Sequence, residues 1–449
     1  EEGEQAFATI ADKPFEVTGV SKKNGNEAPP RLFDLTSLQV ECNRKFSYSA
    51  ETTLNLIQSL YERKFTTYPR VDTQFLSDDI YPKCAGILTG MRGYEQYIQP
   101  LAGKKLPKSK RVFDTSKVTD HHAIIPTGVP ASALSDMERN VYDLIARRFI
   151  AVFYPDCKFA TTTVLGKVEN VEFKVSGKEI LEPGWRTIYA QQPTATQQQI
   201  STSQPNNPQP SSSEDDDKQD EERTLPTFVK GESGPHTPTL TEKWTTPPKY
   251  YTEATLLRAM ETAGKFVDDE TLRAALKENG IGRPSSRAGI IETLFKRHYI
   301  RRERKNLIAT ATGIELIDII HEELLKSCEL TGIWEKKLRD IEHKKYEAAD
   351  FINELKQQVT EIVYDVLRDN SNRRVAITTD EDLKKAKKKK TSTKKAAASP
   401  QPATSEPSAD NSIIGTTCPV CGKGTIIKGK TAYGCSNWKN GCTYRIAFK

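Results

Sequence analysis

The period of the hydrophobic positions changes several times along the chain of 449 residues. Residues 1–33 contain alternating segments such as FEVTGV and a polar stretch, KKNGNEAPP, and this pattern favours strands and loops. In residues 34–154 apolar positions recur every three or four places, which predicts helices, with Ser49 as the N-cap of the second. Period two returns in residues 155–189, where TTTVLGKVENVEFKVSGKEI predicts a β-hairpin. A helical block is therefore expected to be inserted into one β domain.

Two later segments have almost nothing to bury. Residues 190–223 are rich in Gln, Ser, Pro, Asn and Asp, and residues 373–412 include the basic run LKKAKKKKTSTKK. Chains of such composition do not bury enough apolar surface to fold. We therefore predict a disordered polar and acidic linker in the first segment and a disordered basic tether in the second.

The region between them, residues 224–372, has clear helix boundaries. Thr252 is the expected N-cap of one helix, Gly280 the C-cap of the next, and Ser285 the start of a third. The segment YIRRERKNLIATATG then predicts a small hairpin with its turn at residues 305–306. The order helix, tight turn, helix and hairpin is typical of a winged-helix DNA-binding domain.

Composition and charge refine this picture. Hydrophobic residues make up 36% and charged residues 28% of the chain, which suits soluble domains separated by polar linkers. No apolar run reaches the roughly 20 residues needed to cross a membrane, so we expect a cytoplasmic protein without membrane contact. The net charge of +6 averages an acidic block, residues 211–222, and a basic block, residues 383–395. Any contact with a polyanion must therefore come from local patches.

Four of the eight cysteines are crowded into residues 413–449. They are Cys418, Cys421, Cys435 and Cys442. Two pairs of thiolates separated by a short hairpin can hold Zn²⁺ tetrahedrally, and so short a segment has no other way to build a core, so we predict a zinc ribbon. Disulfides or free thiols are the alternative, which the reducing compartment indicated by the scattered other cysteines disfavours. Tyr433, Trp438 and Tyr444 either stack on unpaired bases or form the small core of the ribbon.

The stretch TTYPRVDT, residues 66–73, sets a tyrosine beside a proline. Proline cannot continue a helix, so Tyr68 is expected on an extended segment or turn just beyond one. A tyrosine can attack phosphorus, and Arg70, two residues on, could hold the phosphate. A free phenol has a pKa of about 10, so its ionisation at neutral pH costs about 4 kcal/mol and needs electropositive help. The alternative is a packed turn aromatic beside an ion pair between Arg70 and Asp72.

A second group of polar residues lies in VTDHHAIIPTG, residues 118–128. His121 and His122 are adjacent, and on an extended chain adjacent side chains point in different directions, so the two are not expected to chelate one metal. One of them could donate a proton to a phosphate oxygen, beside Thr127. The alternative is a buried, hydrogen-bonded histidine.

A third group lies in ENGIGRPSSRAGIIETLFKRHYIRRERK. Backbone amides at the helix start near Ser285, together with Arg283, Arg287 and the later basic residues, form a candidate phosphate-binding face. A solvated charged helix is the alternative.

Taken in this order, these motifs resemble those of the type IA DNA topoisomerases, and those of topoisomerase III most closely. The family's active-site signature is tyrosine, any residue, arginine, a small residue and aspartate, which here runs from Tyr68 to Asp72. DHHAIIPTG resembles the topoisomerase III form of the histidine motif, with His121 at the position that contacts the nucleotide or the scissile phosphate. GIGRPSSRAGII combines the topoisomerase I form, GRPS, with the topoisomerase III form, RAGII. The resemblance covers residues 1–372 apart from the linker.

The resemblance implies a multidomain α+β fold. Residues 1–33 and 155–189 would form a β-rich gate arch, and residues 34–154 a helical domain that carries the tyrosine. Residues 224–372 would form a helical, winged-helix-like DNA-binding domain, followed by the tether and the zinc ribbon.

The resemblance also implies an activity. One strand of single-stranded DNA would be cleaved through a 5′-phosphotyrosyl intermediate at Tyr68, another strand passed, and the break resealed without ATP. Arg70 would act with the tyrosine by stabilising charge on the scissile phosphate. The expected DNA contacts are Asp72, His121, His122, Thr127, Arg283, Ser285 and Arg287.

The family also has a toprim domain whose acidic residues hold Mg²⁺, and this sequence shows no hydrophobic strand that ends in Asp-x-Asp. We therefore expect a protein truncated at its N-terminus, inactive alone, and a monomer that binds single-stranded DNA in the nucleoid, with no helicase partner specified. The alternatives are a non-catalytic DNA-binding fragment and topoisomerase I. The His-His pair and the single zinc module disfavour topoisomerase I.

Overall fold

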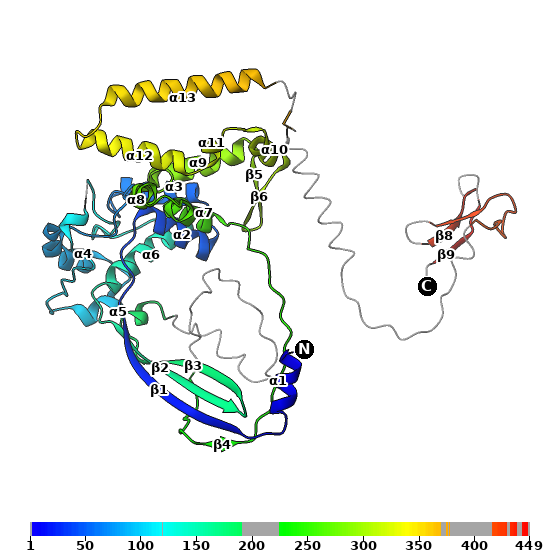
Figure 1. The fold of residues 1–449 in the computed structure, drawn as a ribbon, viewed down its shortest axis with the longest axis horizontal. Helices are drawn as coiled ribbons and strands as arrows, with labels where there is room; N and C mark the ends of the chain where they lie inside the picture. The colour runs from blue at the N-terminus through cyan, green and yellow to red at the C-terminus, as the bar shows by residue number, and fades with distance from the viewer. Residues whose placement is uncertain are drawn as a thin grey trace. The chain divides into compact units, whose positions relative to one another are not determined.

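The computed structural model describes residues 2–118, 120–190, 224–369, 374–375, 377, 415–428, 432–437 and 442–447. Helices and strands both contribute to the fold (Figure 1), and the chain divides into two compact units, residues 1–379 and 380–449. Almost all of the expected linker, 190–223, and of the expected tether, 373–412, lies outside the described residues.

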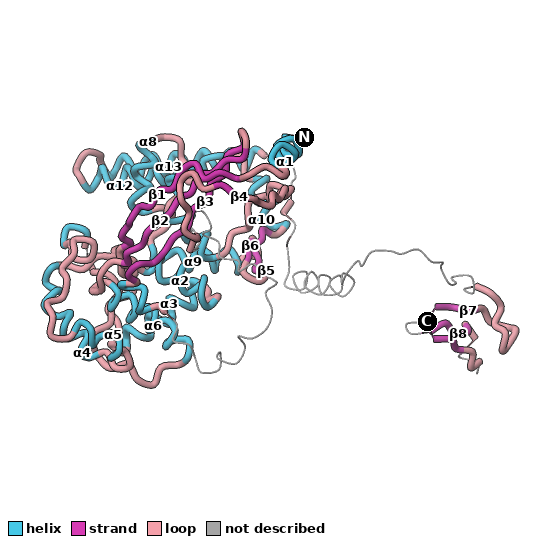
Figure 2. The backbone as a smooth tube through the Cα atoms, turned by 90° about the horizontal axis from the view of Figure 1, so that it is seen from below, coloured by secondary structure: helices cyan, strands magenta, loops and turns pink. Residues whose placement is uncertain are grey.

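A four-stranded antiparallel sheet joins segments that are far apart in the sequence. Its strands are β1 (Phe15–Glu27), β2 (Cys157–Val168), β3 (Val171–Glu182) and β4 (Ser233–Gly234), in the order β3-β2-β1-β4. The three long strands run side by side (Figure 2), with β1 paired to β2 from Glu16 opposite Lys167 to Glu27 opposite Cys157. The helical block therefore lies, in the sequence, between two strands that are neighbours in one sheet. The short strand β4 was not predicted, because only two of its residues pair.

The prediction of strand and loop at the very start of the chain was wrong. Residues Glu2–Ile10 form helix α1, and the first strand begins only at Phe15. The segment EGEQAFATI is rich in good helix formers, and Glu2 and Glu4 lie in the first turn, where acidic side chains favour a helix. An even mix of apolar and polar residues had masked this preference.

Between β1 and β2 lies the helical block. Its elements are α2 (Leu35–Phe46), α3 (Ala50–Glu62), η1 (Asp78–Lys83), α4 (Cys84–Gly90), α5 (Glu95–Ile98), η2 (Gln99–Leu101), η3 (Thr115–Lys117) and α6 (Asp136–Ala151), and η4 (Gly184–Ile188) follows β3. The predicted N-cap of α3 is confirmed, since the Ser49 hydroxyl accepts a hydrogen bond from the Thr52 amide at 3.0 Å. Ile57, Leu60 and Phe149 are fully buried in the core that these helices share.

The region from residue 224 onward is mainly helical. Its elements after β4 are α7 (Glu253–Glu261), η5 (Ala263–Phe266), α8 (Glu270–Asn279), α9 (Pro284–Lys296), β5 (Ile300–Glu303), β6 (Asn306–Ala309), α10 (Ala311–Ile319), α11 (Glu323–Lys326), α12 (Glu329–Glu342) and α13 (Ala348–Arg368). The Thr252 N-cap and the Gly280 C-cap are confirmed. The described helices include none that is both long and apolar enough to span a membrane.

Two boundaries in this region differ from the prediction. Helix α9 begins at Pro284 rather than Ser285, because proline has no N–H to leave unsatisfied in a first turn and its fixed φ suits a helix. The hairpin turn lies at Arg304 and Lys305 rather than at residues 305–306, and Arg304 takes the left-handed conformation with φ 58°.

Helices α7 and α9 pack on α2 and α3 through a second, smaller core. Val40 and Ala50 contact Leu257 and Ile291 there. Polar bonds lie beside this core, including one of 2.9 Å from the Ala50 amide to the Glu253 carboxylate. The tyrosine-bearing block and the later helices are therefore joined by a small, partly polar interface.

The second unit contains a three-stranded antiparallel sheet. Its strands are β7 (Ile426–Lys428), β8 (Ala432–Cys435) and β9 (Arg445–Ala447), with β8 in the centre. The predicted hairpin is therefore present, with one further strand beside it.

Candidate active site

The segment that carries Tyr68 pairs with the segment that carries the two histidines. After α3 the chain turns at Lys64, and Thr66 then forms an antiparallel bridge with Pro126. The Thr67 amide donates to the Ile125 carbonyl at 3.0 Å, and the Thr67 hydroxyl accepts from the Ile125 amide at 3.0 Å. These bonds align the two sequence motifs.

Tyr68 and His121 are brought into direct contact. Their ring centroids are 4.4 Å apart with an interplanar angle of 39°, and the Tyr61 ring meets Tyr68 edge-on at 5.5 Å. Tyr68 is half-buried, whereas His121 is exposed. The phenol therefore lies at the surface between two rings, where a bound strand could reach it.

Burial alternates along the rest of the motif. Pro69 and Val71 are buried, and the Val71 carbonyl accepts from the Leu35 amide at the start of α2. Arg70 and Asp72 are exposed, and within the described residues no ion pair joins them. In an extended segment alternate side chains share a face, so Tyr68, Arg70 and Asp72 lie on the same, outer side. The alternative of an Arg70–Asp72 ion pair is wrong.

His122 and Thr127 are engaged within the protein. The His122 Nδ1 atom lies 2.8 Å from the Ala123 carbonyl, and burial lowers the pKa of this half-buried side chain. The Thr127 hydroxyl donates to the Lys64 carbonyl at 2.5 Å and so closes the turn after α3. Both residues hold the site together, whereas His121 faces solvent.

The three predicted residues of α9 differ in exposure. Arg283 is exposed at the N-cap and Ser285 is half-buried in the first turn. Arg287 is only 2% exposed, and its guanidinium donates to the Ile281 carbonyl at 3.2 Å and to the Thr36 hydroxyl of α2 at 2.9 Å. Burial lowers the pKa of Arg287. Arg287 therefore lies inside the protein rather than on the phosphate-binding face expected from the sequence.

The start of α2 connects α9 to the tyrosine segment. Asp34 is the N-cap of α2, and its carboxylate accepts from the Ser37 amide at 2.6 Å and from the Gln74 side chain at 2.8 Å. Two residues later, Thr36 accepts from Arg287. The segment after Tyr68 and the first turn of α9 are thus fixed to the same helix end.

A clamp between α3 and α6 was not anticipated from the sequence. The Glu138 carboxylate accepts from the Ser135 amide at 2.9 Å, from the Ser59 hydroxyl at 2.7 Å and from Arg63 at 3.2 Å. Arg63 also donates to the Ser132 carbonyl at 2.7 Å. These bonds, first that from the Ser135 amide, lower the pKa of Glu138 to about 2. The capping-box motif SDME, which was the available signal, lies at the start of α6.

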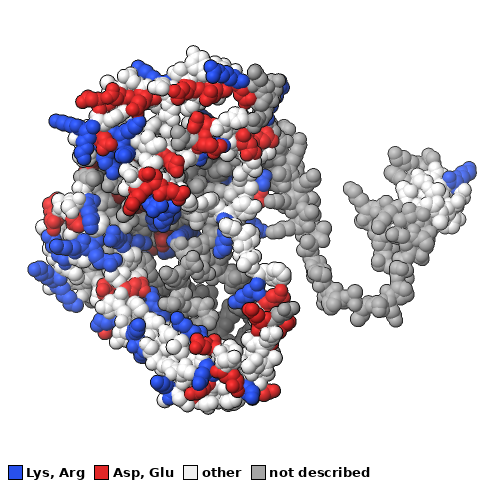
Figure 3. Space-filling model, in the orientation of Figure 1, with Lys and Arg blue, Asp and Glu red and all other residues white. Residues whose placement is uncertain are grey.

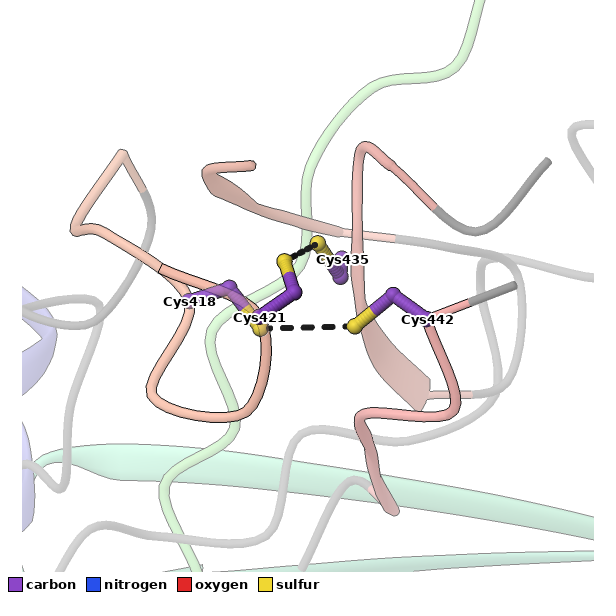
Figure 4. Close-up of side chains that lie close together, drawn as sticks. All are labelled: Cys418, Cys421, Cys435 and Cys442. Carbon is purple, nitrogen blue, oxygen red and sulfur yellow. Dashed lines mark hydrogen bonds between the residues drawn. The ribbon is translucent and has the colours of Figure 1, made fainter. Parts of the chain in front are cut away.

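The four C-terminal cysteines converge on one point (Figure 4). Their Sγ atoms lie within 4.8 Å of one another, with 3.7 Å between Cys418 and Cys442 and 3.5 Å between Cys421 and Cys435. These separations exceed the roughly 2.05 Å of a disulfide and approach the roughly 3.8 Å between sulfurs bound tetrahedrally to zinc at about 2.3 Å. A Cβ on Gly424 would lie 2.4 Å from the Cys435 sulfur, so the backbone passes close to the cluster. The cluster has the geometry to hold one Zn²⁺.

The aromatic residues predicted near this cluster are only partly described. Tyr433 lies in β8 and Tyr444 just before β9, and both are half-buried, while Trp438 lies outside the described residues.

Comparisons with known proteins agree with the motifs. A family model described as DNA topoisomerase matches residues 1–353. DNA topoisomerase 3 of Bacillus subtilis (strain 168) is 33% identical over 452 residues, which cover 98% of this chain and 55% of that protein. DNA topoisomerase 3 of Bacillus anthracis is 38% identical over 367 residues, which cover 78% of this chain and 47% of that protein. The chain therefore spans about half the length of the curated relatives it matches.

Among solved structures, the full-length topoisomerase I from Thermotoga maritima has a similar fold. The TM-score is 0.56 at 20% sequence identity, and the match covers 99% of this chain and 62% of that chain. At this identity the similarity concerns the fold alone.

Proposed function

Because the chain belongs to the type IA DNA topoisomerase family and is similar to bacterial topoisomerase III, we propose that it supplies the strand-cleaving tyrosine of such an enzyme. The oxygen of Tyr68 would attack a phosphorus of single-stranded DNA, forming a 5′-phosphotyrosyl bond and releasing a 3′ hydroxyl. Attack by that hydroxyl on the phosphotyrosine would restore the DNA and free Tyr68. Because the ester keeps the free energy of the broken phosphodiester, resealing would need no ATP.

The observation that carries this proposal is the outer face shared by Tyr68, Arg70 and His121. Arg70 is exposed and has no ion-pair partner among the described residues, so its guanidinium is available to a phosphate. His121 stacks on the tyrosine ring and can contact the same phosphate or donate a proton to it. Asp72, two residues beyond Arg70, would keep the arginine in position.

The proposal assigns supporting roles to the other predicted site residues. His122 and Thr127 would position the paired segments, since both bond to backbone carbonyls. Arg283 and Ser285, at the start of α9, would contact DNA phosphates, as helix N-termini do. Arg287 would join α9 to α2.

The proposal includes Mg²⁺ only because the resemblance to the family implies it. Among the described residues, the four cysteines are the one group with metal-ligand geometry, so none of the described residues near Tyr68 is assigned to Mg²⁺. We propose that a toprim domain supplies this ion, and that the cysteines bind zinc. In the cell we propose a monomer, located in the cytoplasm at the nucleoid.

The sheet suits the role of a gate arch. The helical block leaves β1 and returns to β2, so these strands are its covalent connections to the rest of the first unit. Bending of the sheet would therefore swing the tyrosine away from α7 and α9. Residues 224–372 would be the winged-helix-like domain on the opposite side of the gate.

Covalent capture of DNA tests the proposal. An oligonucleotide labelled at its 3′ end should leave its label on the protein after denaturation, whereas a 5′ label should appear on a released fragment. The assay uses this chain with Mg²⁺, alone and within a longer polypeptide that includes a toprim domain. Tyr68→Phe should abolish the adduct, and Tyr61→Phe, a neighbouring ring with an edge contact, should retain it.

Three results would contradict different parts of the proposal. An adduct formed by the Tyr68→Phe variant would exclude Tyr68 as the nucleophile. Strong binding of single-stranded DNA without any adduct, even with the toprim domain, would instead favour a non-catalytic DNA-binding protein. Relaxation of supercoiled DNA by the 449 residues alone would show that no toprim domain is needed.

A further inference from the structure

A polar groove lies on the helical block, formed by α5, α6 and the end of η4. Two adjoining cavities, of about 500 and about 350 Å³, share the side chains of Gln96, Tyr97, Asp143 and Arg147. Arg92 and Arg139 line the larger cavity. Lys45 and Tyr189 line the smaller one. None of the residues proposed for catalysis lines either cavity.

An ion pair between Arg147 and Asp143, flanked by tyrosines, lines both cavities and forms the floor of the groove. Arg147 Nε donates to both oxygens of Asp143 at 2.9 and 2.8 Å, and Arg147 also donates to the Tyr97 hydroxyl at 3.1 Å. The Tyr94 hydroxyl donates to Asp143 at 3.1 Å. Because Arg147 and Tyr94 satisfy the single carboxylate of the floor, it does not oppose the binding of an anion.

The rim of the groove is positively charged. Lys45, Arg92 and Arg139 line the cavities beside the neutral ion pair, and all three are exposed. Lys45 pairs with Glu41 of the same helix at 3.1 Å. The partner of Arg139 is the exposed carboxylate of Asp136 at 3.1 Å, and a pair so open to solvent leaves the guanidinium free to exchange partners. The lining residues therefore carry a net positive charge.

A basic loop follows the groove in the sequence. Residues 103–111, GKKLPKSKR, come directly after η2 and expose Lys104, Lys105, Lys108, Lys110 and Arg111. Figure 3 shows blue side chains gathered on the part of the helical block near α4. These residues add positive charge to the helical block, which would draw a polyanion toward it.

Two tyrosine rings that line the cavities each lie beside a cation. The Arg147 guanidinium lies 5.1 Å from the centre of the Tyr97 ring, and the Lys45 ammonium 5.8 Å from that of Tyr189. Both tyrosines are half-buried, so each presents part of its ring to the cavity. Aromatic platforms in a positively charged groove are the features by which proteins bind single-stranded nucleic acid without sequence preference.

We propose that this groove binds two or three unpaired nucleotides of single-stranded DNA, at a site separate from Tyr68. Bases would stack on Tyr97 and Tyr189, and phosphates would meet Arg92, Arg139 and Lys45. The wall of the groove at residues 131–134 is held by Arg63, five residues before the tyrosine, so the two sites belong to one rigid block. The choice of DNA as the ligand depends on the proposed function.

The test combines binding with cross-linking, using the whole chain and a thymidine oligonucleotide. The double variant Arg92→Ala/Arg139→Ala removes two rim charges, and Lys167→Ala/Lys174→Ala removes two exposed charges from β2 and β3 as a matched control. Each phosphate contact contributes about 0.7 to the slope of log K against log salt, so the first variant should lower that slope by about 1.4 and the control should not. Photo-cross-linking with bromodeoxyuridine should label peptides that contain Tyr94, Tyr97 or Tyr189.

The outcomes separate this proposal from the catalytic one. Tyr68→Phe should keep the cross-links in the groove. The rim variant, placed in the longer polypeptide with a toprim domain, should still form the covalent adduct at saturating oligonucleotide. An unchanged salt slope in the rim variant, or cross-links that map only outside the groove, would overturn the proposal. If thymidine monophosphate competed as strongly as the oligonucleotide, the groove would be a mononucleotide site rather than a strand-binding one.

Discussion

Replacement of Glu138 by glutamine tests how much the hydrogen bonds of this carboxylate, which join α3 to α6, stabilise the folded protein. Glu138 is 9% exposed, and its carboxylate accepts hydrogen bonds from Ser135, Ser59 and Arg63. Glutamine has nearly the same shape but lacks the charge, and its amide nitrogen cannot accept from these donors. The depression of the Glu138 pKa from 4.5 to about 2 corresponds to about 3 kcal/mol of stability at neutral pH, since one pKa unit is about 1.4 kcal/mol.

The stabilisation by Glu138 depends on pH, and the direction of this dependence follows from its lowered pKa. A carboxyl group with a depressed pKa stabilises the folded state fully above its unfolded pKa, and this contribution is lost as the pH falls through the folded pKa. The Glu138→Gln variant should therefore unfold with a free energy about 2 to 3 kcal/mol lower than the wild type at pH 7. The difference should shrink between pH 4.5 and pH 2. Urea unfolding followed by near-ultraviolet circular dichroism at several pH values would measure it.

Asp136→Asn is the matched control, because Asp136 lies in the same helical turn. Its side chain is 92% exposed and pairs only with the exposed Arg139. Such a surface pair contributes at most about 1 kcal/mol. A Glu138→Gln effect that is independent of pH, or no larger than that of Asp136→Asn, would refute the account of the clamp.

Two further predictions concern the zinc cluster and the support of the paired segments. A chelator should release one equivalent of zinc from the chain, and Cys421→Ser should prevent zinc binding, both measured with a colorimetric zinc assay. The thermal unfolding of residues 1–379 should stay unchanged in both cases. Gly90→Ala should destabilise by roughly 1 to 3 kcal/mol, because the new Cβ would lie 2.0 Å from the Gly128 carbonyl, whereas Gly86→Ala in the same helix meets open space and should stabilise by about 1 kcal/mol. Equal melting temperatures for the two glycine variants would contradict the second prediction.

The features of the fold that could be predicted from the sequence are those set by local interactions. The caps at Ser49 and Thr252 depend on side chains that bond within three residues, so their sequence context is sufficient. Burial of Arg287 depends on Thr36, which is 251 positions away, and no local pattern reveals such a partner. The contact between Tyr68 and His121 could be predicted only in part. A sequence motif indicated each residue, but their proximity depends on the pairing of the two segments in the fold.

The buried position of Arg287 can be reconciled with the gate opening that we propose. The helical block and α7 to α9 meet at a small core flanked by bonds to charged side chains, including Arg287 to Thr36 and the Ala50 amide to the Glu253 carboxylate. Large apolar interfaces resist separation in water, whereas charged groups regain hydration when they part. If the arch swings the tyrosine away, as we propose, this interface must separate and uncover the Arg287 guanidinium beside Arg283. The same arginine would then fasten the closed state and, in the open state, face the strand that passes through the gate.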